Sequence, residues 1–95
     1  MRNFDFFNIN YTKGRTGSQF VIRGDVQNRS GRHYTSVALR IIFFNKLIPI
    51  INEIIVVNDL PSGSTKSFEK YVEEVDYDLV AKQITRYEVS MEDAY

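Results

Sequence analysis

The sequence predicts an all-β protein, an antiparallel sandwich of six to seven strands. Apolar and polar residues alternate with a period of two along most of the chain, as they do in strands that bury one face. Glycine, proline and asparagine interrupt this alternation at short intervals. Parallel strands need long crossover connections, which the sequence does not offer, so the strands are expected to pair antiparallel.

The first two strands are expected over residues 4–11 and 19–28. In the first, Phe7, Ile9 and Tyr11 form the expected inner set. In the second, alternate residues from Phe20 to Val26 fall on the dry face, and Val21 begins the wet face.

Further strands are expected over residues 37–43, 50–57, 64–72 and 87–92. Residues 76–83 are the only segment with helical character, because an aspartate is placed to cap a short turn of clustered apolar residues. We interpret this segment as a short helical turn that crosses between the sheets, with a seventh strand as the alternative.

Turn signals separate these strands at residues 13–18, 28–31, 46–49 and 60–63. In the last of these, Pro61 takes the second position and Gly63 the fourth, which a type I turn prefers.

Length and composition predict one domain over residues 1–95. The chain is 43% hydrophobic, which suffices for a packed interior, and it contains no cysteine. Residues 1–8 lack the apolar core of a signal peptide, and polar residues and Pro49 interrupt the aliphatic run at residues 41–57. We therefore expect no transmembrane segment.

Charge is balanced overall but divided between the two halves. Residues 1–50 contain eight Lys or Arg and two acids, whereas residues 51–95 contain four Lys or Arg and ten acids. One interpretation is that basic and acidic strands pair in the fold. The other is a basic face that binds an anion or a nucleic acid.

The middle of the chain carries more apolar side chains than one inner sheet face requires. Either the fold covers them, or some stay exposed as an interaction surface for another protein. The aliphatic strand at residues 50–57 would also favour self-association if it lay at a sheet edge. The candidate interaction residues are Ile42, Phe44, Leu47, Ile48, Ile51 and Ile55.

Residues 19–69 resemble the FxLYD-type domain of bacterial and archaeal proteins. The shared pattern is Gly-x-Val-x-Asn, a small polar turn, Tyr-x-x-Val-x-Leu, an aromatic pair, an aliphatic strand, a Leu-x-x-Gly turn and Ser-x-Phe. Phe44-Asn45 departs from it, because that family more often has Tyr-Asp there. The matching residues are Gly24, Val26, Asn28, Ser30, Gly31, Tyr34, Val37, Leu39, Phe43, Phe44, Asn45, Leu60, Pro61, Gly63, Ser67 and Phe68.

The resemblance implies an immunoglobulin-like sandwich without established catalysis, and it assigns no functional residues. It favours an extracellular or cell-envelope location, although this chain shows no signal peptide. Fold alone does not determine function.

Residues suited to catalysis or metal binding are few. His33, the sole histidine, is interpreted as a turn residue, so no catalytic residues, cofactor or metal site are predicted. The acidic stretch at residues 73–78 is the best candidate for an ion site, with solvated surface carboxylates as the alternative. Asn10 and Asn28 each begin a glycosylation sequon.

These observations favour a non-enzymatic β-sandwich module, a protein-interaction or spacer domain of an envelope-associated protein. The alternative is anion or nucleic-acid binding through the basic N-terminal half.

Overall fold

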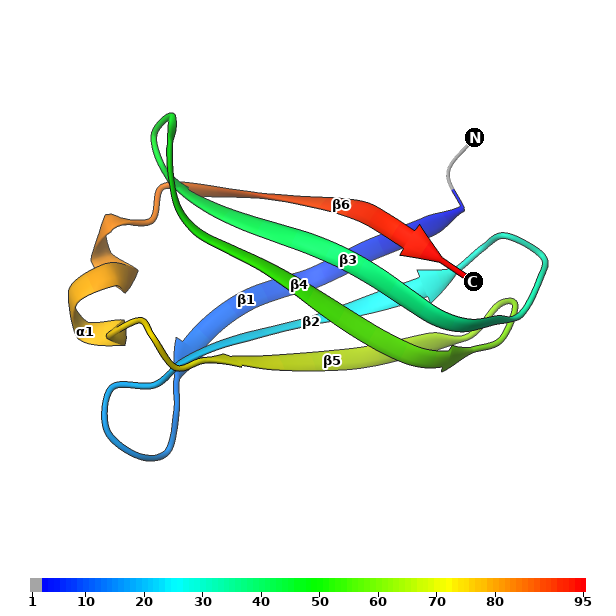
Figure 1. The fold of residues 1–95 in the computed structure, drawn as a ribbon, viewed down its shortest axis with the longest axis horizontal. Coiled ribbons are helices and arrows are strands. Elements are labelled where there is room, and N and C mark those ends of the chain that lie inside the picture. Colours follow the sequence, from blue (N-terminus) through cyan, green and yellow to red (C-terminus); the bar gives the residue numbers. More distant parts are fainter. Residues whose placement is uncertain (1–2) are drawn as a thin grey trace.

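The computed structural model describes residues 3–95, and these form two facing three-stranded antiparallel sheets (Figure 1). The prediction of an all-β sandwich is confirmed, with six strands among the described residues. The strands are β1 (Phe4–Lys13), β2 (Phe20–Asn28), β3 (Tyr34–Asn45), β4 (Ile48–Leu60), β5 (Thr65–Val72) and β6 (Arg86–Ala94).

The strand order is β1-β2-β5 in one sheet and β4-β3-β6 in the other, so β2 and β3 are the central strands. Across the sandwich β5 lies beside β4, while β1 and β6 border the opposite side (Figure 1). This arrangement gives the molecule two lateral sides with different side chains.

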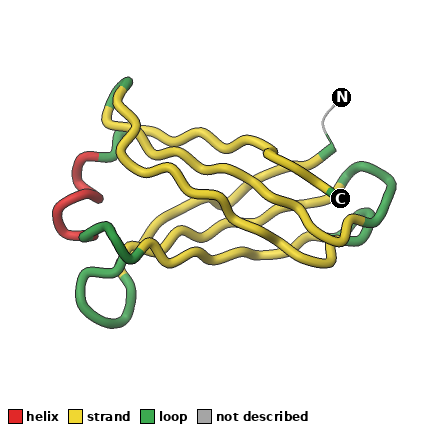
Figure 2. The backbone as a smooth tube through the Cα atoms, in the orientation of Figure 1, coloured by secondary structure: helices red, strands yellow, loops and turns green. Residues whose placement is uncertain are grey.

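A helical turn closes one end of the sandwich between β5 and β6, and Figure 2 shows it in red. It consists of α1 (Tyr77–Val80) and the 3-10 turn η1 (Ala81–Gln83). The Asp76 carboxylate caps α1 by accepting a hydrogen bond of 2.9 Å from the backbone N–H of Asp78. The predicted helical turn is therefore confirmed over the alternative of a seventh strand.

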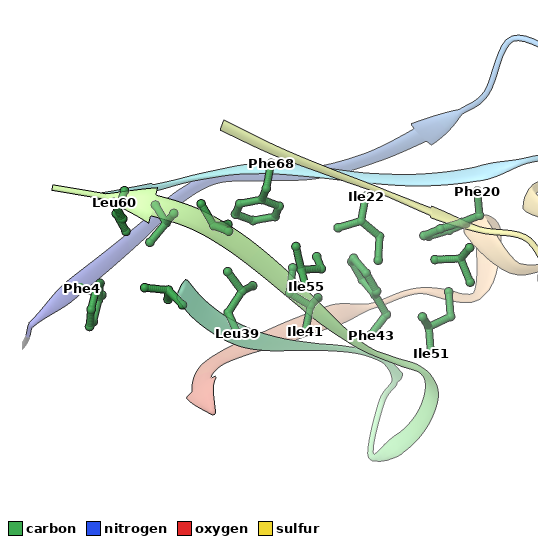
Figure 3. Close-up of a cluster of buried hydrophobic side chains, with 14 residues drawn as sticks. Phe4, Phe20, Ile22, Leu39, Ile41, Phe43, Ile51, Ile55, Leu60 and Phe68 are labelled. Carbon is green, nitrogen blue, oxygen red and sulfur yellow. The ribbon is translucent and has the colours of Figure 1, made fainter. Parts of the chain in front are cut away.

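The core lies between the two central strands (Figure 3). Alternation predicted its composition, because inner-facing side chains of β2 and β3 are fully buried. Val89 of β6 packs against this core but is only half-buried, since its strand lies at a sheet edge. The fully buried inner residues of the two central strands include Phe20, Ile22, Val26, Val37, Leu39, Ile41 and Phe43.

Gly24 lies on the inner face of β2, where a side chain would not fit. A Cβ at this position would lie 2.5 Å from the Ile9 Cδ1 atom and 2.6 Å from the Phe68 Cζ atom. The glycine thus makes room for two large side chains from the flanking strands.

The predicted inner set of β1 was wrong at Phe7, which is 39% exposed. Pairing with β2 shifts register between Phe7 and Asn10, and Asn8 adopts a positive φ of 54°. This β-bulge reverses the alternation, so that Phe6 packs on the core before the bulge and Ile9 after it.

Val21 was expected on the wet face of β2, yet it is fully buried. Its neighbours on the adjacent strands are Thr12 and Tyr71, which flank it on the outer face of the sheet. A central strand is covered on both edges, so a small outward side chain can be buried there.

The two hairpin turns in the middle of the chain differ from the predicted ones. The β3–β4 connection is a tight turn at Lys46 and Leu47, where Lys46 has φ 58°, and Pro49 belongs to β4. In the β4–β5 turn the Ser64 N–H donates to the Pro61 carbonyl, which places Gly63 third rather than fourth. Its φ of 80° is the conformation that a type II turn requires at that position.

Candidate interaction surfaces

Of the six candidate interaction residues, three are buried and three reach the surface. Ile51 and Ile55 are each only 4% exposed and point into the core (Figure 3), so the fold covers them. Phe44 is also buried, and the Arg86 guanidinium lies over its ring at 3.9 Å. The interpretation that the fold itself covers the surplus apolar side chains is therefore correct for these three residues.

The other three candidates reach the surface. Leu47 and Ile48 are 84% and 66% exposed at the tip of the β3–β4 hairpin, which projects from the sandwich in Figure 1. Ile42 is half-buried on the outer face of β3.

Sequence reasoning missed two exposed aliphatic residues on β4, Ile54 and Val56. Once Ile55 faces inward, the strand period turns its two neighbours outward. Ile54 lies opposite Arg40 on β3 and Val56 lies opposite Ala38. The alternation within residues 50–57 predicts that Ile54 and Val56 are exposed, but only once it is known which residues of the strand face the core.

The side chains of Ile42, Ile54 and Val56 lie on the outer face of the β4-β3-β6 sheet and form an apolar surface, here named the outer patch. The Arg40 guanidinium crosses it and is held by a 2.8 Å hydrogen bond to the Glu92 carboxylate. A mixture of aliphatic groups with a fixed arginine is typical of protein-binding surfaces. The exposed Leu47 and Ile48 lie beyond the outer patch, at the tip of the hairpin.

A second surface feature is a groove of about 380 Å³ where β1 and β6 border the sandwich, lined mostly by apolar side chains together with exposed polar atoms. Side chains at the rim of the core are partly exposed to solvent in this groove. We name it the lateral groove. Its lining is formed by Phe4, Phe6, Ile9, Tyr87, Val89, Ser90 and Met91.

The opposite side of the sandwich, between β4 and β5, carries polar contacts beside a hollow of about 350 Å³. Glu53 points inward from β4 and approaches the Lys70 ammonium of β5 at 3.9 Å. The Lys66 ammonium donates a 2.7 Å hydrogen bond to the Asn58 carbonyl. Inward-pointing charges at a strand edge discourage pairing with another chain.

Ion pairs join the basic half of the chain to the acidic half. Lys13–Asp78 (3.0 Å), Arg23–Glu69 (2.8 Å) and Arg40–Glu92 link strands or elements far apart in sequence. These contacts favour charge pairing within the fold over a basic face for an anion. Each exposed pair adds little to stability.

Arg29 binds within its own half, to Asp5 at 2.8 Å. The hydrogen bond and the charge of Asp5 raise the pKa of the Arg29 guanidinium.

Two carboxylates of the acidic stretch at residues 73–78, Asp76 and Asp78, have structural partners. Asp76 caps α1, and Asp78 accepts hydrogen bonds from Lys13 and Ser18, which lower the pKa of the Asp78 carboxyl. Within residues 3–95, no three His, Cys, Asp or Glu side chains are grouped so as to hold a metal ion.

His33 precedes β3, and its Nε2 atom lies 2.9 Å from the Asp59 carboxylate. Both side chains are exposed at this end of the sandwich. The contact joins the β2–β3 turn to the end of β4.

Asn28 is the one buried polar side chain within the described part of the chain. Its amide donates to the carbonyls of Arg32 (2.7 Å) and Leu60 (2.8 Å). Its side-chain oxygen accepts from the backbone N–H and the hydroxyl of Ser30. A fully bonded, buried amide is inaccessible for glycosylation, whereas Asn10 is exposed.

A polar hollow of about 380 Å³ lies on the outer face of the β1-β2-β5 sheet. At its centre Asp25 accepts hydrogen bonds from the Ser67 hydroxyl (2.6 Å) and the Asn8 amide (2.8 Å). These two bonds, the Ser67 bond foremost, lower the pKa of the Asp25 carboxyl. The carboxylate thereby ties the bulge of β1 to β5.

No protein-family model, curated protein or solved structure matches this chain. In the described residues, no helix has the length and apolar character needed to cross a membrane.

Proposed function

We propose that this chain is a non-catalytic protein-interaction or spacer domain of an envelope-associated protein, and that it binds its partner through the outer patch. The observation that carries the proposal is the exposure of adjacent aliphatic side chains on one strand, with Ile54 44% and Val56 56% exposed. Exposed apolar groups gathered on one face mark interaction surfaces.

The strand order supports an immunoglobulin-like assignment. The order β1-β2-β5 corresponds to A-B-E of that fold, and β4-β3-β6 corresponds to C′-C-F. The FxLYD-type resemblance agrees with this assignment, because its Asn28 ends β2 and its Gly31, with φ 83°, lies in the β2–β3 turn.

The non-catalytic part of the proposal is supported by how the polar side chains are used. Asp25, Asp76, Asp78 and Asn28 each hold backbone or neighbouring strands in place. Their hydrogen bonds explain their positions without a reaction.

The proposal is tested by comparing the wild type, Ile54→Ser/Val56→Ser and the control Leu79→Ser as immobilised baits. Leu79 is an exposed leucine on α1, away from the outer patch. Captured proteins are identified, purified and titrated by calorimetry. The double variant should weaken binding by about tenfold or more, because it removes apolar contact area, while the control retains wild-type affinity.

Equal affinity for all three chains would refute the outer patch as the binding surface. Salt-dependent binding to a polyanion, lost in Arg29→Ala/Arg32→Ala, would assign the function to the basic half instead.

A further inference from the structure

We infer that two copies of this chain pair antiparallel along β6, so that their β4-β3-β6 sheets join into one sheet. The inference concerns the β6 edge and not the outer patch, so it stands or falls separately from the proposed function. It rests on the free edge, the lateral groove beside it and the sequence of β6.

Among the edge strands of the described residues, β6 has a regularly paired stretch whose inward-facing side chains, Tyr87, Val89 and Met91, are all apolar. The bulge at Asn8 interrupts β1. Pro49 and the inward-pointing Glu53 lie on β4, and Lys66 and Lys70 lie on the facing edge of β5. In β6 the pairing with β3 is regular from residue 86 to residue 91, and its bulge comes only after Met91.

The lateral groove supplies the apolar contact that strand pairing alone lacks. Tyr87, Val89 and Met91 point from β6 toward β1, and the structure leaves them partly exposed. A second β6 placed beside the first would cover them with the same three side chains of the other copy.

The sequence of β6 is self-complementary in one antiparallel register, the register in which Val89 faces Val89 of the second copy. Tyr87 then faces Met91 of the other copy. Arg86, which pairs with Glu88 in its own copy, faces Glu92, which pairs with Arg40. Each contact occurs twice by symmetry, as an isologous two-fold interface requires. Apolar side chains meet in the grooves, and opposite charges meet on the outer face.

Neighbouring registers that keep inner faces together are disfavoured by charge. Sliding the second strand by two residues places Glu88 opposite either Glu88 or Glu92 of the other copy. Like charges directly opposite each other destabilise a strand pair. The charge pattern therefore selects the register centred on Val89.

The absence of cysteine from the sequence allows a direct test by Val89→Cys. Under mild oxidation, this variant should form a disulfide-linked dimer in high yield, because directly opposed residues have Cβ atoms about 5 Å apart. The control Val56→Cys, a valine on β4, should stay largely uncrosslinked. Sedimentation equilibrium of the wild type should give about twice 11.1 kDa at high concentration.

A second variant, Val89→Lys, places two ammonium groups opposite each other. It should weaken dimerisation by about 100-fold or more, with its fold checked by circular dichroism. Ile54→Ser/Val56→Ser should dimerise like the wild type.

The inference is overturned if the wild type stays monomeric at millimolar concentration. It is equally overturned if Val56→Cys crosslinks as well as Val89→Cys. If Val89→Lys does not fold, the comparison of crosslinking in Val89→Cys and Val56→Cys decides whether β6 forms the interface.

Discussion

Asn28 shows how a single side chain can set the end of a sandwich. It holds the β2–β3 turn through Arg32 and Ser30, and it holds the end of β4 through Leu60. Its own backbone bonds with Gly63 and Ser64 add the β4–β5 turn. The sequence marked this position as a turn residue, but its burial follows only from three segments meeting there.

Asn28→Ala should lower the free energy of unfolding by about 2–4 kcal/mol, because the buried carbonyl of Leu60 and the partly buried carbonyl of Arg32 lose their donor. Urea denaturation measures the change. The control is Asn58→Ala, which removes an exposed hydrogen bond to Ser36 and should cost about 1 kcal/mol or less. Equal losses would contradict the structural role of Asn28.

Asp25 predicts a pH dependence of stability. Because its pKa is lowered in the folded state, the ionised carboxylate stabilises the fold above about pH 4, and this contribution is lost as the pH falls through the folded-state pKa. Asp25→Asn should be less stable than the wild type at pH 7, and the difference should shrink at pH 2–3. Denaturation midpoints at both pH values measure it, and a difference that is independent of pH would contradict the assignment.

At the scale of elements, alternation predicted the central strands better than the edge strands. In β2 and β3 the period of two runs unbroken through the core residues. In β1 the bulge at Asn8 reversed it, and the pattern could not reveal an extra residue that the partner strand leaves unpaired. Two asparagines within three residues were the only local signal, since Asn tolerates positive φ.

The β3–β4 hairpin contains the surplus of apolar residues. Alternate residues along its strands face the core or the solvent. Ile51→Ala should cost about 2–5 kcal/mol because it leaves a cavity in the core. Leu47→Ala, at the exposed tip, should change stability by about 0.5 kcal/mol or less. Thermal and urea unfolding of both variants measure this contrast, which would disappear if the hairpin were not folded as described.

At the scale of the whole molecule, the two lateral sides of the sandwich differ. Glu53, Lys66 and Lys70 place charged groups along the β4/β5 side, whereas the β1/β6 side exposes apolar side chains in the lateral groove. Sequence alone could not predict this asymmetry, because it depends on which strands become neighbours across the two sheets. Ile54 and Val56 of the outer patch were missed for another reason, because their exposure follows only once Ile55 is known to face the core.

Amide hydrogen exchange, followed by NMR at low and high protein concentration, tests the sandwich and its pairing edge together. The amides of β2 and β3 should be the most protected at both concentrations, because these strands are central. Amides of β6 that point away from β3 should exchange quickly in dilute protein and slowly in concentrated protein, while β4 stays unchanged. This account would be contradicted if the exchange rates of the β6 amides did not depend on protein concentration. It would also be contradicted if the amides of β4, and not those of β6, exchanged more slowly in concentrated protein.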